Sequence, residues 1–186
     1  MTTLSKVLIG LGASVALLVV VAVTSVIGIN NELVRHEATI QAQYKQNQNN
    51  YSNYFNKLQE VAQVPAMYKN DLKEVYTAAI SGRYGAGGSK AVFQFLKEQN
   101  PNFDASLYTK IQQVVESGRN AFEADQKTLL ERKRVYEIAL KEFPRSFVAG
   151  ALGFPKINLA EFDIVTNDAT ENAFKTKKAG PIKLTQ

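Results

Sequence analysis

Residues 7–29 form an uninterrupted apolar run, and no other feature of the sequence limits the fold so strongly. The run, VLIGLGASVALLVVVAVTSVIGI, holds 23 residues without a charge, and only Ser14, Thr24 and Ser25 are polar. As an α-helix it would be about 34 Å long, enough to cross a hydrocarbon core of about 30 Å. The hydroxyl groups of these residues can donate hydrogen bonds to carbonyls of their own helix. They therefore need no water, which the bilayer core does not supply. We therefore predict a transmembrane helix that includes Val7, Leu11, Leu17, Val21 and Ile27.

A cleaved signal peptide is the alternative interpretation of this run. Signal peptides have an apolar core of about 7–15 residues, followed by a small-residue cleavage site. This run is longer and no clear A-x-A pattern comes after it, so we expect an uncleaved, single-pass anchor in a bacterial inner or cytoplasmic membrane. Lys6 precedes the run while Arg35 and Lys45 come after it, which is close to a tie under the positive-inside rule. The side of the membrane that carries the rest of the chain stays open.

The pattern becomes amphipathic directly after the apolar run. Alternating steps of four and three residues connect one helical face, and seven of its nine positions are apolar or aromatic: Leu33, Glu37, Ile40, Tyr44, Asn47, Tyr51, Tyr54, Leu58 and Val61. Such a stripe predicts a long helix with one buried face and, over QAQYKQNQNN, a polar outer surface. No helix breaker separates it from the apolar run, so we expect one helix that continues as far as Val64, before Pro65. His36 lies off the stripe, and we expect it to be solvated.

Further one-sided helical patterns occupy the rest of the chain. Residues 66–81 and 90–99 are separated by the glycine-rich connector SGRYGAGGS, and a longer pattern then runs to Phe143, with Pro144 as its terminator. The apolar side of this longer pattern consists of Leu107, Ile111, Val114, Phe122, Leu129, Tyr136, Leu140 and Phe143. The only strand-like stretch is FDIV at 162–165.

Helices with one apolar side bury those sides against each other. The predicted fold class is therefore all-α, with an N-terminal transmembrane helix continuing into an antiparallel helical bundle. We divide the chain into a short N-terminal segment (1–6), the transmembrane helix (7–29), the bundle (30–155) and an extended C-terminal segment with a basic tail (156–186).

The stretch FPRSFVAGALGF resembles the C-terminal signature of the LemA family. That signature is a long helix rich in tyrosine and charge, then Phe-Pro, then a small apolar turn with Val-Ala and Gly-Phe. The matching residues here are Phe143, Pro144, Val148, Ala149, Gly153 and Phe154. An N-terminal span that leads into Asn31, Leu33 and Val34 is similar to the family's Asn-x-Leu-Val element, and NPNFDASLYTKIQQVVES resembles the start of its later long helix.

This resemblance covers most of residues 1–155 and describes a divergent member. The family's Arg-rich Leu-Ile-Pro-Asn-Leu element is replaced by EVAQVPAMY, in which only Pro65 matches. The resemblance implies a membrane-anchored, antiparallel, LemA-like helical bundle at 30–155, in a family without an established enzymatic activity.

The small apolar residues after Pro144 have two interpretations. We expect Pro144 to end the long helix and the chain to pass closely over the bundle, where Phe147, Leu152 and Phe154 plug its end. The alternative is a patch that contacts a partner or the membrane, formed by Phe143, Pro144, Phe147, Val148, Ala149, Gly153 and Phe154.

Composition and motifs argue against catalysis. The chain has no cysteine, which excludes disulfides, thiolate metal sites and cysteine nucleophiles, and its single histidine excludes a His-rich metal site within one chain. It contains neither G-x-S-x-G nor H-E-x-x-H. Charged pairs such as Glu137 and Lys141 have the i,i+4 spacing of surface ion pairs. We predict a non-enzymatic protein without catalytic, metal or cofactor-binding residues.

Two functions fit these observations. The first is a membrane-anchored module that binds or scaffolds other proteins, including further copies of itself, because Gly10–Ser14 and Gly12–Ala16 have small-xxx-small spacing. The second is a membrane-proximal binder of anionic lipid or envelope polymer, based on the net charge of +5 and on the tail lysines Lys175, Lys177, Lys178 and Lys183. The expected partners are the lipid bilayer and other proteins. Nucleic acid is not expected, because no aromatic residues interleave these lysines.

Overall fold

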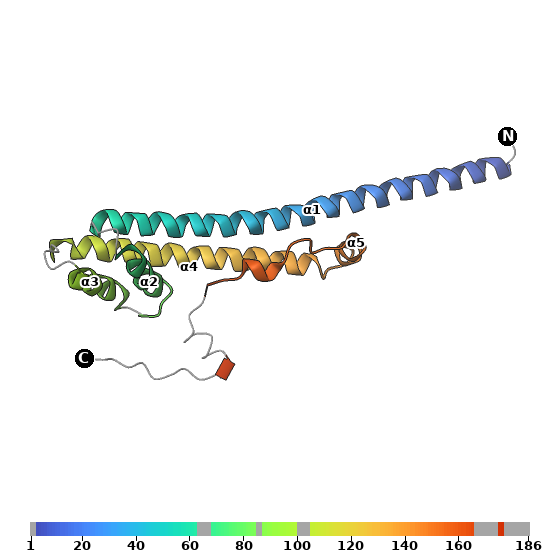
Figure 1. The fold of residues 1–186 in the computed structure, drawn as a ribbon. Helices are drawn as coiled ribbons and strands as arrows, with labels where there is room; N and C mark the ends of the chain where they lie inside the picture. Colours follow the sequence, from blue (N-terminus) through green and yellow to red (C-terminus); the bar gives the residue numbers. More distant parts are fainter. Residues whose placement is uncertain (1–2, 63–67, 85–86, 100–104, 166–174, 177–186) are drawn as a thin grey trace. The chain divides into compact units, whose positions relative to one another are not determined.

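The computed structural model is all-α in the part of the chain that it describes, residues 3–62, 68–84, 87–99, 105–165 and 175–176. In chain order its elements are α1 (Thr3–Ala62), α2 (Lys69–Ile80), α3 (Gly88–Gln99), the 3₁₀ turn η3 (Ala105–Leu107), α4 (Tyr108–Ala139), α5 (Arg145–Leu152) and the 3₁₀ turn η4 (Leu159–Phe162). The long helices α1 and α4 pack against each other in a helical bundle (Figure 1). The predicted all-α fold class with a helical bundle is confirmed, and FDIV forms no strand. That α1 crosses a membrane stays a prediction.

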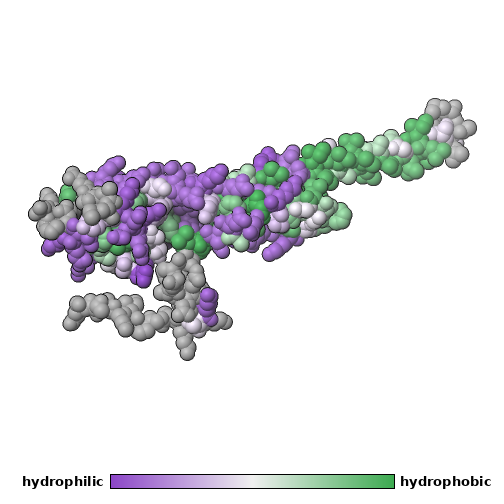
Figure 2. Space-filling view, viewed as in Figure 1, coloured by the Kyte–Doolittle hydropathy of each residue, from purple (hydrophilic) through white to green (hydrophobic). Residues whose placement is uncertain are grey.

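The apolar run and the amphipathic stripe belong to one continuous helix, α1. Within the run, Ser14 Oγ donates to the Gly10 carbonyl at 3.0 Å and Ser25 Oγ donates to the Val21 carbonyl at 2.7 Å, so these hydroxyls are satisfied inside the helix. Of the described helices, α1 is the one that is long and apolar enough to cross a membrane. Its most apolar stretch of 18 residues is not buried by the rest of the described chain. Figure 2 shows this stretch as a continuous hydrophobic surface. The predicted end at Val64 lies outside the described residues.

The chain divides into two compact units, to each of which α1 and α4 contribute. Unit 1 comprises Met1–Gln41 and Glu131–Phe162, and unit 2 comprises Ala42–Leu130 and Asp163–Gln186. The boundaries that we drew at 29/30 and 155/156 stay a prediction. Of the four tail lysines, Lys175 is described and exposed, and the other three lie outside the described residues.

The core of unit 1 lies where the predicted stripe of α1 meets α4 and α5. Its buried apolar residues are Leu33 and Ile40 from α1, Tyr136 and Ala139 from α4, and Val148 and Ala149 from α5. The period of the stripe therefore identified the buried face of α1 correctly in this unit. One buried member of the stripe, Glu37, is charged.

The core of unit 2 is apolar and draws on four helices. Its buried cluster consists of Phe55, Leu58, Ala62, Leu72, Tyr76, Ala79, Ile80, Val92, Leu96, Ile111, Val114 and Val115. Two glycines permit close packing around α2. A Cβ at Gly88 would lie 3.1 Å from the Ala79 carbonyl oxygen, and a Cβ at Gly118 would collide with the Tyr76 hydroxyl. The two glycines therefore set how closely α3 and α4 approach α2.

Helix α4 ends earlier than the periodicity predicts. It stops at Ala139, and residues 140–144 form a turn instead of extending the helix to Phe143. Leu140 N still donates to Tyr136 O and Glu142 N to Ile138 O, both at 3.0 Å, so the helix unwinds gradually. Pro144 explains this end, because it has no N–H for the carbonyl of Leu140 and its ring would clash with that carbonyl if the helix continued. Smaller differences concern α2, which is described from Lys69, and α3, which begins at Gly88.

Candidate functional site

The residues after Pro144 fold into a helix, which corrects the small apolar turn expected there. Pro144 is the N-cap of α5, a position where a missing N–H costs no helical hydrogen bond. At the other end Gly153 adopts a left-handed conformation with φ 72°, and its N–H points to the carbonyls of Ala149 and Gly150. Glycine is the residue that ends a helix in this way at least cost. Both ends of α5 are therefore explained by a proline and a glycine in the sequence.

Helix α5 buries one face and exposes the other. Val148 and Ala149 are buried, whereas Phe143 and Phe147 are 86% and 76% exposed. Leu152 is also exposed and Phe154 is half-buried. The expectation that Phe147 and Leu152 plug the end of the bundle is therefore wrong. We refer to the exposed side chains of Phe143, Phe147 and Leu152 together as the α5 patch. Its two phenylalanines are more exposed than any other large hydrophobic residue described.

Arg145 fastens α5 to α1 through Glu32. Its Nη2 lies 3.0 Å from Glu32 Oε1, and its Nε donates to Glu32 Oε2 at 3.1 Å, which is the two-pronged geometry favoured by guanidinium and carboxylate. The hydrogen bond from Arg145 is the main cause that holds the pKa of Glu32 below its ordinary value, although desolvation acts in the opposite direction. A second carboxylate, Glu142 Oε2, lies 3.3 Å from Arg145 Nη1. The position of α5 beside α1 is thus fixed by charge as well as by packing.

Glu37 joins α1 to two other segments of unit 1. This carboxylate is only 6% exposed, and its Oε1 accepts hydrogen bonds from the Tyr136 hydroxyl and from the backbone N–H of Lys156, both at 2.6 Å. Tyr136 is itself fully buried. Burial raises the pKa of the Tyr136 hydroxyl, and the hydrogen bond to Glu37 raises it further. Glu37 therefore connects α1 with α4 and with the chain beyond α5.

His36 is not solvated in the way that its place off the stripe predicted. Its ring centroid lies 6.0 Å from that of Tyr136, its Nε2 lies 3.8 Å from Glu32 Oε1, and the side chain is partly buried. Within the described residues, no three His, Asp or Glu side chains gather as a metal site would require. The prediction of a chain without catalytic, metal or cofactor-binding residues stays a prediction.

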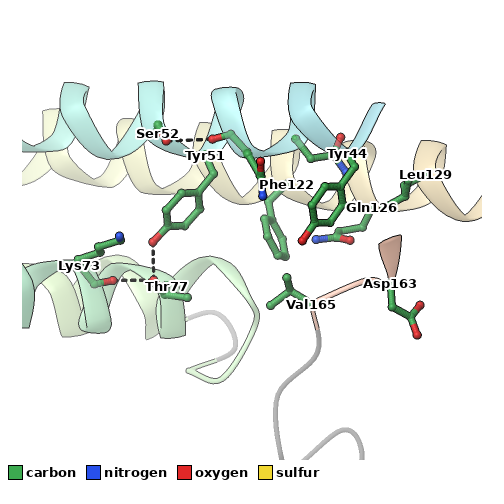
Figure 3. A pocket seen from close by; sticks show the side chains of 12 residues that line it. Tyr44, Tyr51, Ser52, Lys73, Thr77, Phe122, Gln126, Leu129, Asp163 and Val165 are labelled. Atoms are coloured by element: carbon green, nitrogen blue, oxygen red, sulfur yellow. Dashed lines mark hydrogen bonds between the residues drawn. The ribbon is translucent and has the colours of Figure 1, made fainter. Parts of the chain in front are cut away.

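Unit 2 contains an open groove of about 360 Å³. Apolar and aromatic side chains make up much of its wall, and Lys73 and Asp163 add charge: the apolar and aromatic members are Tyr44, Tyr51, Phe122, Leu129 and Val165. Figure 3 shows Val165 pointing toward Phe122 across this groove. The Tyr51 and Thr77 hydroxyl oxygens lie 2.6 Å apart and so hold one wall in place. A concave, mostly apolar groove of this volume with a few polar groups has the features of sites at which proteins bind other molecules.

The Gln- and Asn-rich part of α1 is the polar helix surface that its periodicity predicted. Asn47 Nδ2 donates to the Asp125 carbonyl at 3.1 Å, and Asn50 Nδ2 donates to Asp125 Oδ2 at 2.9 Å. Gln43 and Gln46 in turn donate to Asn47 and Asn50, both at 2.8 Å. Asp125 therefore links α4 to this part of α1 through polar contacts.

The structure brings some of the predicted residues together and separates others. The predicted span residues all lie on α1 and are more than half exposed: Val7, Leu11, Leu17, Val21 and Ile27. The signature residues divide, because Val148 and Ala149 are buried while Phe143, Pro144 and Phe147 are exposed or half-exposed. Sequence reasoning missed the role of Glu37, although a charge on an apolar stripe was a signal for it.

Comparisons of the chain with family models, with curated proteins and with solved structures gave no match. The resemblance to the LemA family therefore stands on the sequence motifs alone and stays a prediction.

Proposed function

We propose that this chain is a single-pass membrane protein whose helical bundle binds other proteins as a scaffold, without enzymatic activity. One observation carries the membrane part of the proposal. The large side chains in the apolar run of α1 are exposed. The rest of the described chain buries no part of the most apolar 18-residue stretch of this helix. A surface of this extent is unfavourable in water and favourable in a hydrocarbon core.

A signal sequence would present the same composition, so the proposal also rests on the segment of α1 beyond the run. α1 continues without a break to Ala62, and Leu33 and Ile40 of the same helix are fully buried in unit 1. Cleavage after the run would leave the remaining helix with a new, uncapped N-terminus close to this core. We therefore favour an uncleaved anchor.

Membrane extraction tests the anchor. The full-length protein, expressed in a bacterial host, should remain in the membrane pellet after an alkaline carbonate wash and be released only by detergent. The double substitution Leu17→Lys and Val21→Lys should reduce retention, because each charge at the centre of a span costs about 2.5–3.5 kcal/mol. Val34→Lys, at an exposed position beyond the run, is the matched control. A soluble full-length chain, or a mature chain that lacks residues 1–29, would contradict the proposal.

The groove of unit 2 supports the scaffold part of the proposal. A photo-crosslinking amino acid at Ser52, which is exposed and lines the groove, should capture a discrete protein, either a partner or a second copy of this chain. The same amino acid at Asn56, an exposed position of α1 outside this lining, is the control. Equal capture at both positions, or capture of lipid alone, would count against a protein-binding groove.

The alternative is a membrane-proximal binder of anionic lipid or envelope polymer. It is supported by the net charge of +5 and by the basic composition of the C-terminal tail. Salt distinguishes the two functions, because the Debye length falls to about 4 Å near ~0.5 M salt. Electrostatic binding to lipid or polymer should be lost under this condition, whereas a packed protein contact should persist.

We also propose that the chain is a divergent member of the LemA family. The support is the signature around Phe143 and Pro144 and the Asn31–Val34 element just after the apolar run. The all-α architecture agrees with the fold that the resemblance implies.

A further inference from the structure

The α5 patch lies close to the point where the predicted membrane span ends. Glu32 lies three residues beyond Ile29, which is about 4.5 Å along a helix axis. The interfacial layer of a bilayer is about 5–8 Å thick on each side of the hydrocarbon core. Glu32 therefore falls within this layer if the span ends at Ile29. Because Arg145 binds both carboxylate oxygens of Glu32, the first turn of α5 is held at the same depth.

The composition of α5 suits this depth. Phe147 on α5 and Phe143 in the turn just before it are highly exposed, whereas Val148 and Ala149 are buried in unit 1. Just beyond the helix, Lys156 Nζ lies 4.5 Å from the centroid of the Phe154 ring. Helices that lie in a membrane interface combine aromatic and aliphatic residues on one face with lysine or arginine that reaches the headgroups. α5 and its flanking residues carry both features.

The shape of the patch favours lipid over a folded partner. At 86% and 76% exposure, Phe143 and Phe147 protrude from the surface instead of lining a groove. Fluid acyl chains can surround two protruding rings, whereas a protein partner would need a pocket for each. The apolar surface of α1 also begins within one turn of Glu32, so a membrane that covers one of these surfaces reaches the other.

We propose that α5 lies in the interfacial layer of the membrane, with Phe143 and Phe147 inserted among the lipid headgroups and upper acyl chains. This inference rests on the proposed membrane anchor and adds a second contact between the protein and the bilayer. The Arg145–Glu32 ion pair sets the depth of that contact, because it joins α5 to the base of the span.

Site-specific labelling can test this, because the chain contains no cysteine of its own. We would place single cysteines at Gly150 on α5, at Leu18 in the span and at Asn49 in unit 2. A Cβ at Gly150 meets no heavy atom within 4 Å, so a label there leaves both phenylalanines in place. Each labelled full-length protein would be reconstituted into vesicles of phosphatidylcholine and phosphatidylglycerol. Quenching by a lipid that carries a shallow acyl-chain quencher would be compared with quenching by aqueous iodide.

The expected result is a ratio of lipid to iodide quenching at position 150 that is severalfold higher than at position 49. Adding Phe143→Ser and Phe147→Ser to the Gly150→Cys chain should return this ratio to the value at position 49. Both phenylalanines are exposed, so the helical circular dichroism should not change. If these changes unfold α5, the ratio at position 150 in the parent chain still decides the question.

Three outcomes separate the inference from the anchor on which it rests. A deep label at position 18 with an iodide-accessible label at position 150 would overturn the inference and leave the anchor intact. Shielding of position 150 from both quenchers would assign the patch to a protein contact and also overturn it. An iodide-accessible label at position 18 would overturn the anchor itself, and with it the interfacial position of α5.

Discussion

Units 1 and 2 each bury a tyrosine completely, but only the tyrosine of unit 1 has a hydrogen-bond partner for its hydroxyl among the described residues. In unit 1, Tyr136 donates to Glu37 at 2.6 Å. In unit 2, the hydroxyl of Tyr76 has no hydrogen-bond partner among the described residues and lies against the bare backbone of Gly118. Burial is the largest cause that raises the pKa of both phenols. Tyr136 is thus held in place by a hydrogen bond, whereas Tyr76 is held in place by close packing.

The rings around Tyr76 show why unit 2 retains an unpaired hydroxyl. Its ring centroid lies 6.0 Å from that of Tyr51 and 5.8 Å from that of Phe55, distances at which aromatic pairs attract each other. An unpaired buried hydroxyl costs free energy, but the packing of the ring offsets that cost. In unit 1 the hydroxyl of Tyr136 instead has a hydrogen-bond acceptor, Glu37. Removing the hydroxyl should therefore cost more stability at Tyr136 than at Tyr76.

The largest effect is expected at Glu37. Glu37→Leu keeps the volume but removes the acceptor of two donors, the Tyr136 hydroxyl and the Lys156 N–H, at a cost of about 1–3 kcal/mol for each donor. Urea unfolding of the full chain in detergent micelles, monitored by circular dichroism, measures the loss. Glu37→Gln, which keeps a carbonyl acceptor, is the control and should lose less. Unchanged hydrogen exchange at the Lys156 amide in the leucine variant would refute this account of unit 1.

Removing the hydroxyl from each of the two buried tyrosines compares the two units most directly. Tyr136→Phe should lower the free energy of unfolding by about 1.5–3 kcal/mol, because the lost hydrogen bond ends on a carboxylate. Tyr76→Phe should be neutral or stabilising, since it removes a buried hydroxyl that has no partner in the described chain. The same urea titration compares both variants with the parent protein. Equal losses at the two positions would remove the distinction between the units.

Gly118 tests whether shape controls unit 2. Gly118→Ala should destabilise the protein by about 1–3 kcal/mol, because the added Cβ overlaps the Tyr76 hydroxyl and must displace it. Combining it with Tyr76→Phe should recover most of that loss, since the colliding oxygen is gone. The double-mutant cycle, measured by urea unfolding, should therefore show strong coupling between the two positions. Additive effects would mean that the ring and the glycine do not share this space.

The smallest effect is expected from the ion pair that holds α5. Arg145 lowers the pKa of Glu32, so the pair contributes stability above the ordinary pKa of 4.5 and loses it as the pH falls through the lowered value. Both side chains are about a third exposed, which limits the contribution through solvent screening. The stability difference between the parent and Arg145→Gln should therefore shrink as the pH falls below 4.5. Arg35→Gln, an exposed position of α1, should show no such trend.

The parts of the fold that were predictable from sequence are those in which burial has a local period. The stripe placed the buried face of α1 correctly at Leu33, Ile40 and Leu58, because a helix that buries one face must repeat apolar residues every three to four positions. Phe55 and Ala62 are also buried, although the stripe does not include them. The same period failed at Phe143, where the adjacent proline unwinds the helix before the pattern ends. Local signals also misled at α5, since small residues after a proline are compatible with a turn and with a short capped helix.

The candidate site was less predictable because its contacts join distant parts of the chain. Glu37 meets Tyr136 across 99 residues and Lys156 across 119, and the second contact uses a backbone group that leaves no trace in the side-chain pattern. The groove of unit 2 likewise combines α1, α2 and α4 with Asp163 and Val165. No periodicity within one segment encodes such a combination.

The contact between Glu37 and residue 156 has a consequence for how this chain can change over evolutionary time. Because the carboxylate accepts from the main chain, the identity of the side chain at position 156 does not affect the bond. Every standard amino acid except proline supplies that N–H. As far as this bond is concerned, position 156 can therefore hold any residue except proline, whereas position 37 must keep a hydrogen-bond acceptor.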